Sequence, residues 1–277
     1  MYGLGLSIVS DVLSPLAFVV QKLAHMRDGN IYRSPLWWFG VVLLGVSEIG
    51  NGVAYGDHDI PTSSIAAVGA VGIVANAFFA RIILKEHMHD LGFVGVGLIT
   101  LGVVEVVLFT PQRDVHLQTS DILEILGRPV SVGVFGGMGV ALAVSFVVAR
   151  KHPIMWIVCG TTCGALTVVS ARVVFLFVNT MVVEGVGAWN WYVVPFVGVL
   201  LAFGTLQLVF TNRALANMKA NTVIPLTYVG FTLIASVSGS IIYDEVSEGT
   251  SSEWVIVANS IVMCMLGIRF VQYNTGA

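Results

Sequence analysis

Four ionisable side chains lie inside long apolar runs of the sequence, where they are costly to bury. They are Asp11, Glu48, Glu105 and Arg172. An ionisable group within an apolar span costs about 2.5–3.5 kcal/mol on insertion scales and tends to face a partner or a polar cavity. We therefore expect the four side chains to share one polar cavity. A buried pair between Arg172 and a carboxylate would explain Arg172 equally well.

Glu48 is the candidate with the clearest chemical setting. Asn51 follows it by three residues and Tyr55 by seven, so all three lie on one face of a helix. A carboxylate and an amide oxygen on one face suit a hard cation that keeps several of its waters. Glu48 and Asn51 are the predicted cation ligands. Asp11 or Glu105 would supply a second carboxylate, and Tyr55 would line the path.

Two further residues are candidates for the substrate pathway. Asn76 stands between Ala75 and Ala77 in a segment rich in Gly and Ala, where small side chains let helices approach closely. Pro225 frees a backbone carbonyl near the start of its segment, and that carbonyl could line a cavity. A simple kink there is the alternative. Spaced glycine pairs, Gly133-xxx-Gly137 and Gly160-xxx-Gly164, are typical of close helix packing.

Catalysis finds little support in the sequence. There is no His-Glu-x-x-His, Gly-x-Ser-x-Gly or Walker motif, so we expect neither an enzyme nor a bound cofactor. Cys159 and Cys163 are one helical turn apart, as metal ligands could be, although free cysteines are more often small buried apolar residues. His87 and His89 lie in a short connection and are expected to be solvated.

Composition places these residues in a membrane protein. Of 277 residues, 56% are hydrophobic and 10% charged, against about a quarter charged in a typical soluble domain. The mean hydropathy is +0.90, which suits lipid as the solvent. The net charge of −3 argues against nucleic acid as a partner. We expect one membrane domain over residues 1–277, surrounded by membrane lipid. The domain could form a homodimer, which the sequence does not decide.

Nine apolar segments are long enough to cross a hydrocarbon core of ~30 Å, which needs about 20 residues. They cover residues 3–22, 36–55, 61–84, 91–110, 129–149, 154–178, 190–211, 222–243 and 254–272. Pro35, Pro61, Pro129 and Pro153 lie at or just before segment starts, where a missing amide is harmless. The sequence predicts an all-α integral membrane protein with nine transmembrane helices.

The basic residues predict the orientation. With the N-terminus outside, ten of the 13 Lys and Arg fall on the cytoplasmic side and two outside, while Arg172 is within a helix. The bias follows the excess of Lys and Arg that cytoplasmic loops carry, and it predicts a cytoplasmic C-terminus. The outer connections are acidic. Their acidic residues would concentrate cations near an entrance. The alternative is that the outer loops are acidic only because the basic residues are on the cytoplasmic side.

Weak internal similarity predicts an inverted repeat. Segment 61–84 ends in Arg-Ile-Ile-Leu-Lys-Glu, and segment 222–243 ends in Ser-Ile-Ile-Tyr-Asp-Glu. The two are five helices apart and so run in opposite directions, which puts a substrate site between the halves near the midplane. The approximate halves are residues 1–110, with four helices, and 129–277, with five.

The motifs resemble those of NIPA-type magnesium transporters, within the drug/metabolite transporter superfamily. The matching runs are Gln21-Lys22 with His25, Ser34-Pro-Leu-Trp-Trp-Phe-Gly40, Glu48-Ile-Gly-Asn51, Ala54-Tyr55, Gly69-Ala70, Asn76-Ala77, Leu84-Lys-Glu86, Asn212-Arg-Ala-Leu215, Thr222-Val-Ile-Pro225 and Phe231-Thr232. The resemblance implies nine helices, an outside N-terminus, and magnesium uptake at the plasma membrane or endosomes. Ala67, Glu105 and Arg172 depart from that family's usual pattern.

The leading hypothesis is a secondary transporter or channel-like carrier of Mg²⁺ or a related divalent cation, the ion being its substrate. An organic metabolite carrier is the alternative. Arg172 would then bind a substrate anion. A receptor or scaffold that transports nothing ranks below both, because the short loops offer little surface for partners.

Overall fold

A computed structural model describes most of the chain. Its described backbone covers residues 2–28, 31–55, 69–110, 124–184, 191, 193–242 and 249–272. Within these ranges, the side chains at 2–4, 54–55, 169, 172–173, 175–176, 179–184 and 272 lie outside the described residues.

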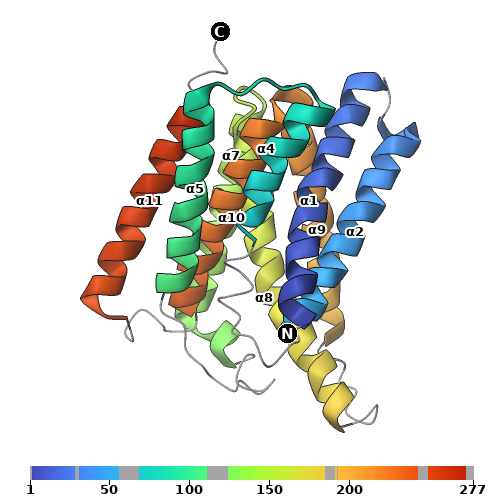
Figure 1. The fold of residues 1–277 in the computed structure, drawn as a ribbon. Helices are drawn as coiled ribbons and strands as arrows, with labels where there is room; N and C mark the ends of the chain where they lie inside the picture. The colour runs from blue at the N-terminus through green and yellow to red at the C-terminus, as the bar shows by residue number, and fades with distance from the viewer. Residues whose placement is uncertain are drawn as a thin grey trace. The chain divides into compact units, whose positions relative to one another are not determined.

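The described residues form helices and no strands, which confirms the all-α prediction. The elements are α1 (Tyr2–Arg27), the 3₁₀ helix η1 (Ile31–Arg33), α2 (Pro35–Tyr55), α4 (Val71–Ile83), α5 (Asp90–Phe109), α7 (Pro129–Ala149), α8 (Met155–Glu184), α9 (Val193–Asn217), α10 (Ala220–Ile242) and α11 (Ser251–Gln272). Figure 1 shows them as long rods. Each predicted apolar segment overlaps one α-helix.

Seven helices in the described ranges are long and apolar enough to cross a membrane. They belong to α1, α2, α5, α7, α9, α10 and α11, and their mean hydropathies run from 1.4 to 2.3. The described apolar stretches Val71–Ile83 and Met155–Val168 are shorter. The chain is therefore a helical integral membrane protein.

The helices group into two compact units. One contains residues 1–109, 211–229 and 255–277, and the other contains residues 110–210 and 230–254. The first unit holds α1, α2, α4, α5, the end of α9, the start of α10 and most of α11. Nearly all the candidate site residues fall in this unit.

Small residues hold α1 and α2 close together in the first unit, where Figure 1 shows the two helices side by side. A Cβ added at Gly40 would lie 2.7 Å from Cγ of Gln21 and 2.9 Å from the carbonyl oxygen of Ala17. Near the other end of the contact, the Ser47 hydroxyl donates a hydrogen bond of 2.7 Å to the Ser10 carbonyl. Large side chains along this seam would push the helices apart.

The opposite flank of α2 carries an apolar stripe. Val42, Val46, Ile49 and Val53 are all more than half exposed and recur at helical spacing. Such a stripe suits contact with lipid. At ~100° per residue its centre lies about a third of a turn from Glu48, so the carboxylate is on a different flank of the helix.

A second close contact joins α5 and α11, also in the first unit. The Cβ that a side chain would add at Gly95 falls 2.6 Å from the Gly267 carbonyl oxygen, and the converse distance from Gly267 to Gly95 is 2.7 Å. At Gly102 the added atom would meet Cys264 Sγ at 2.7 Å. These glycines allow the two backbones to touch, as in many membrane helix pairs.

The two predicted glycine pairs in the second unit differ in outcome. Gly164 packs against Gln207 and Phe231, at 2.9 Å and 3.0 Å from an added Cβ. Gly133 and Gly137 have no such neighbour among the described residues. Close packing at Gly133-xxx-Gly137 therefore stays a prediction, because spacing alone does not identify which helix face meets a neighbour.

The α1–α2 seam is tested by adding one methyl group to α2. Gly40→Ala should lower the unfolding temperature in detergent, because the new atom overlaps α1 and overpacking costs about 1–3 kcal/mol. Gly45→Ala is the matched control on the same helix, since a Cβ there has no neighbour within 4 Å. It should be neutral or stabilising, as alanine favours helix. Equal unfolding temperatures for the two variants would contradict the seam.

Candidate functional site

Asp11 and Asn51 meet directly across the α1–α2 seam. The Asn51 side-chain amide donates a hydrogen bond of 3.0 Å to one carboxylate oxygen of Asp11. The Ser7 hydroxyl donates to the other at 3.1 Å, and its oxygen lies 3.5 Å from the Asn51 Oδ1. Ser7 is buried, whereas Asp11 and Asn51 are half-buried. The helices thus bring two of the four predicted cation ligands into contact.

Glu48 lies one turn before Asn51 on the same side of α2. Its side chain is exposed, and it is close enough to Asp11 for their charges to interact. No basic side chain in the described residues pairs with either carboxylate; the one ion pair found there joins Arg128 to Glu124. Two carboxylates without a counter-ion need a proton or a cation when both are taken from water.

A backbone oxygen of Asp11 lies beside a third helix, α4. Pro15 has no amide hydrogen, so the carbonyl of Asp11, four residues earlier, lacks its usual helical donor. Gly72, at the start of α4, packs against this carbonyl, and a Cβ there would be 2.9 Å from the oxygen. Asp11 therefore offers a carboxylate and a carbonyl freed from the helix ladder at the meeting point of α1, α2 and α4.

Glu105 has a different setting. It is half-buried on α5 and accepts a hydrogen bond of 2.8 Å from the Ser260 hydroxyl of α11. In the described structure it makes no bond to Asp11, Glu48 or Asn51. The four predicted cation ligands therefore divide into a group of three on α1 and α2 and a single carboxylate at the α5–α11 contact.

The predicted pathway residues fall into two groups. Asn76 is buried on α4, and its side-chain amide donates to the Ala220 carbonyl at 3.4 Å, whereas its Oδ1 has no partner in the described residues. Pro225 is buried inside α10, where it frees the carbonyl of Asn221. The side chains of Tyr55 and Arg172 lie outside the described residues.

A second polar network surrounds Asn212 near the end of α9. Its amide donates to the Gln21 Oε1 at 2.6 Å, while its own oxygen accepts from the Trp37 indole at 2.9 Å. The His25 Nε2 lies 3.2 Å from the same oxygen. Gln21, Trp37 and Asn212 are buried. This network ties α1, α2 and α9 together.

Charged side chains hold the junction between α9 and α10 from both sides. The Lys22 ammonium donates to the carbonyls of Leu215 and Met218, the latter at 2.9 Å. The Glu86 carboxylate accepts from the backbone amides of Ala220 at 2.9 Å and Asn221 at 3.0 Å. Cations favour helix C-termini and anions favour N-termini, so both contacts match the helix dipoles.

Lys85 places Glu86 at this junction. Its φ of 56° is the left-handed conformation that ends many helices and that usually falls to glycine. The chain turns there, and the Glu86 amide donates back to the Ala80 carbonyl at 3.1 Å. Keeping this backbone conformation with a lysine costs roughly 1–2 kcal/mol. The turn delivers the carboxylate to the start of α10.

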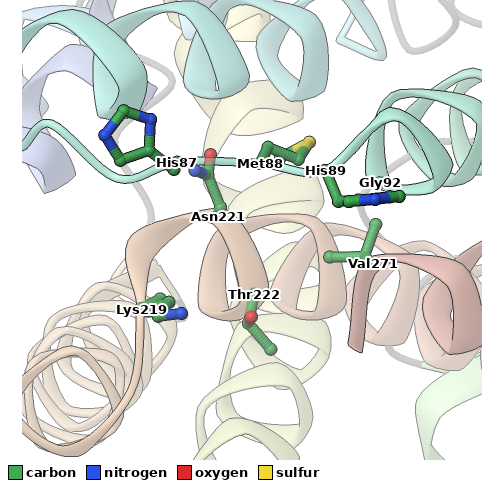
Figure 2. A pocket seen from close by; sticks show the side chains of 8 residues that line it. All are labelled: His87, Met88, His89, Gly92, Lys219, Asn221, Thr222 and Val271. Atoms are coloured by element: carbon green, nitrogen blue, oxygen red, sulfur yellow. The ribbon is translucent and has the colours of Figure 1, made fainter. Parts of the chain in front are cut away.

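Figure 2 shows a small cavity beside this junction, between the 87–89 segment and the start of α10. Its lining residues are His87, Met88, His89, Gly92, Lys219, Asn221, Thr222 and Val271. The volume of about 20 Å³ holds one water or two. The side-chain amide of Asn221 and the hydroxyl of Thr222 are buried there without a partner in the described residues, so water is the simplest occupant.

The junction residues were not predicted as site residues from the sequence. Lys22 counted as a loop charge and as a motif residue, and Gln21, His25, Glu86 and Asn212 served only as motif residues. Their common signal was available, because each is a polar residue at or near the end of an apolar segment. Their pairing depends on residues from 134 to 196 positions apart, which spacing within one helix does not reveal.

This arrangement is that of a polytopic membrane protein with a polar site between its helices. The family model described as Magnesium transporter NIPA matches residues 1–276, so the chain belongs to that family. The prediction of this family from the sequence motifs is confirmed.

Curated relatives agree with the family. The chain is 27% identical to the "Probable magnesium transporter NIPA6" of Arabidopsis thaliana over 263 residues, which covers 88% of this chain and 78% of that protein. It is 24% identical to the human "NIPA-like protein 2", over 99% and 74% of the two chains. It is 25% identical to the mouse "Magnesium transporter NIPA1", over 96% and 85%. No solved structure matches the chain.

The Asn212 network is tested by removing its centre. Asn212→Ala leaves the buried groups of Gln21 and Trp37 without a partner, and each orphaned group costs about 1–3 kcal/mol. The unfolding temperature followed by tryptophan fluorescence in detergent should fall clearly. Asn217→Ala is the control, because Asn217 is exposed and bonds only within its own helix, to the Arg213 carbonyl. A loss in the control equal to that in Asn212→Ala would contradict the role of the network.

Proposed function

We propose that this chain carries Mg²⁺, or a related divalent cation, across a membrane, with Asp11, Glu48 and Asn51 as the ion site. The observation that carries the proposal is the direct contact of Asp11 with Asn51 beside a second carboxylate, Glu48, which pairs with no basic side chain in the described residues. Relatives named as magnesium transporters support the choice of ion.

The donor set fits this cation. Mg²⁺ is commonly held through one or two carboxylates while keeping several of its waters. Asp11 and Glu48 supply two carboxylates, and the Asn51 oxygen supplies a neutral ligand. The charge of the ion removes the repulsion between the two carboxylates.

The membrane potential is a sufficient energy source for uptake. An inside-negative potential of 100 mV favours entry of a doubly charged ion by about 4.6 kcal/mol. The chain then works as a secondary transporter or channel-like carrier in the plasma membrane or endosomes. Nine membrane passes, related as an inverted repeat, and an outside N-terminus complete the proposal.

The ion site is tested by neutralising its carboxylates. Glu48→Gln and Asp11→Asn should each lower Mg²⁺ entry into proteoliposomes at least about tenfold, because each removes one charged ligand. Glu124→Gln is the control: this exposed carboxylate pairs with Arg128 outside the site, and its loss should leave entry unchanged. Glu105→Gln should also have little effect, since Ser260 engages that side chain away from the other three.

Two outcomes would contradict the proposed function. Wild-type Mg²⁺ entry in Glu48→Gln and Asp11→Asn protein that is correctly inserted would remove the site. Uptake of an organic solute that is indifferent to chelation of external Mg²⁺ would favour the metabolite carrier instead.

The orientation is tested with single introduced cysteines. The native Cys159, Cys163 and Cys264 are buried, so they give a low background. A membrane-impermeant thiol reagent added to intact cells should label Glu124→Cys and spare Lys151→Cys, because the excess of basic residues places Lys151 inside. Labelling of Lys151→Cys alone would reverse the proposed orientation.

A further inference from the structure

We infer that the end of α9 is a second cation-binding position on the ion path, and that the Lys22 ammonium occupies it in this structure as a tethered substitute for the ion. The inference rests on the proposed transport of a divalent cation. It assigns the position to the backbone carbonyls of Leu215 and Met218, which both accept hydrogen bonds from Lys22.

The carbonyls form a site because the helix ends there. The final four carbonyls of an α-helix have no partner within it, and the helix dipole gives that end a partial negative charge. α9 stops at Asn217 and α10 begins at Ala220, so the break between them is a turn of two residues that joins two helices long enough to span a membrane, and the Lys22 side chain reaches carbonyls on its α9 side. Carbonyl oxygens at the C-terminal ends of half-helices coordinate the transported cations in other membrane carriers, where the helix is broken within one span; here the helix end lies at the turn between α9 and α10.

The opposite side of the break is already neutralised. The Glu86 carboxylate accepts from the first two amides of α10, and the Asn76 amide donates to the Ala220 carbonyl. The start of α10 is thereby fixed and closed to an anion. On the carbonyl side, Lys22 of α1 is the side chain that bonds to Leu215 and Met218 in the described structure; it is half-buried and comes from a distant part of the sequence. An ion of the same sign can therefore replace it.

Lys22 also lies on the same face of α1 as the proposed ion site. It follows Asp11 by eleven residues, which is about three turns at 3.6 residues per turn and ~16 Å along the helix. Asp11 and Lys22 thus lie at two points along one face of α1. Asp11 presents a carboxylate that accepts bonds from Asn51 and Ser7, and Lys22 presents an ammonium bound where a cation would bind. An ion leaving Asp11 towards this end has to displace Lys22.

Three point variants of the full chain distinguish competition between Lys22 and the ion from a purely structural role of Lys22 at the end of α9. Lys22→Met removes the competing ammonium, and the Mg²⁺ concentration that half-saturates entry into proteoliposomes should fall about tenfold, because a like charge no longer opposes the ion. Lys22→Arg keeps the positive charge and should behave like wild type. Lys151→Met removes an exposed lysine elsewhere and should also behave like wild type.

A half-saturating concentration that is unchanged in folded Lys22→Met protein would overturn the inference, because Lys22 would then only brace the helix end. An equal change in Lys151→Met would overturn it as well. Thermal unfolding of each variant establishes that the compared proteins are folded.

A second measurement uses the unmodified protein, so it does not depend on the folding of a variant. Mg²⁺ should make the Lys22 amine react faster with an acylating reagent in detergent, as read by mass spectrometry, because the bound ion releases the side chain to water. The Lys151 amine should show no such change. No effect of Mg²⁺, Mn²⁺ or Co²⁺ on Lys22 would refute the second position. If the wild-type protein shows no Mg²⁺ entry, the proposed transport function is wrong. The labelling of Lys22 still tests whether the end of α9 binds a cation, because it does not require transport.

Discussion

The close approach of α1 and α2 is the constraint on which the polar site depends. Ordinary packing with larger side chains keeps helix axes about 8–10 Å apart, with apolar atoms filling the space between. Here the small residues Gly40 and Ser47 leave no such layer of side chains, so the backbone of α1 lies against α2. The gap that remains is spanned by the Asp11 and Asn51 side chains. The carboxylate is thereby held by two hydrogen bonds without being shut away from the exposed Glu48.

Helix ends pose the second constraint, because the last carbonyls and the first amides of a helix have no partner within it. The chain meets it at the α9–α10 break with side chains from other helices: Lys22 for the carbonyls and Glu86 for the amides. The matching of charge to helix end is the same principle that stabilises helices in water. In this protein it also brings an ammonium and a carboxylate to the turn between α9 and α10, beside the cavity lined by His87, His89 and Asn221.

The sequence predicted the class, the family and the helices well, because apolar length and polar interruptions are properties of single segments. The seven helices able to span, and the grouping of Glu48 and Asn51 on one flank of α2, followed from such local patterns. Local patterns could not separate Glu105 from Asp11, since both are lone carboxylates and only the contact between α5 and α11 distinguishes them. The number of passes and the inverted repeat stay predictions.

The spacing of residues within one segment could not predict the roles of Lys22, Glu86 and Asn212, for a related reason. Each bonds to a residue more than a hundred positions away, and two of them bond to backbone rather than to a complementary side chain. Every residue type carries backbone carbonyls and nearly every type carries a backbone amide, so the sequence does not show which residue will be such a partner. Similarly, the free carbonyl at Asp11 follows from Pro15, but its importance appears only when Gly72 brings α4 beside it.

The contact of Cys264 with Gly102 gives this protein an internal reporter. The thiol is free and fully buried, and its sulfur lies where a side chain at position 102 would begin. A reagent can reach the sulfur only after α11 moves away from α5, so its rate of modification follows the local opening of that pair rather than unfolding of the whole chain. The rate at which a thiol reagent modifies Cys264 thus measures how often α5 and α11 separate.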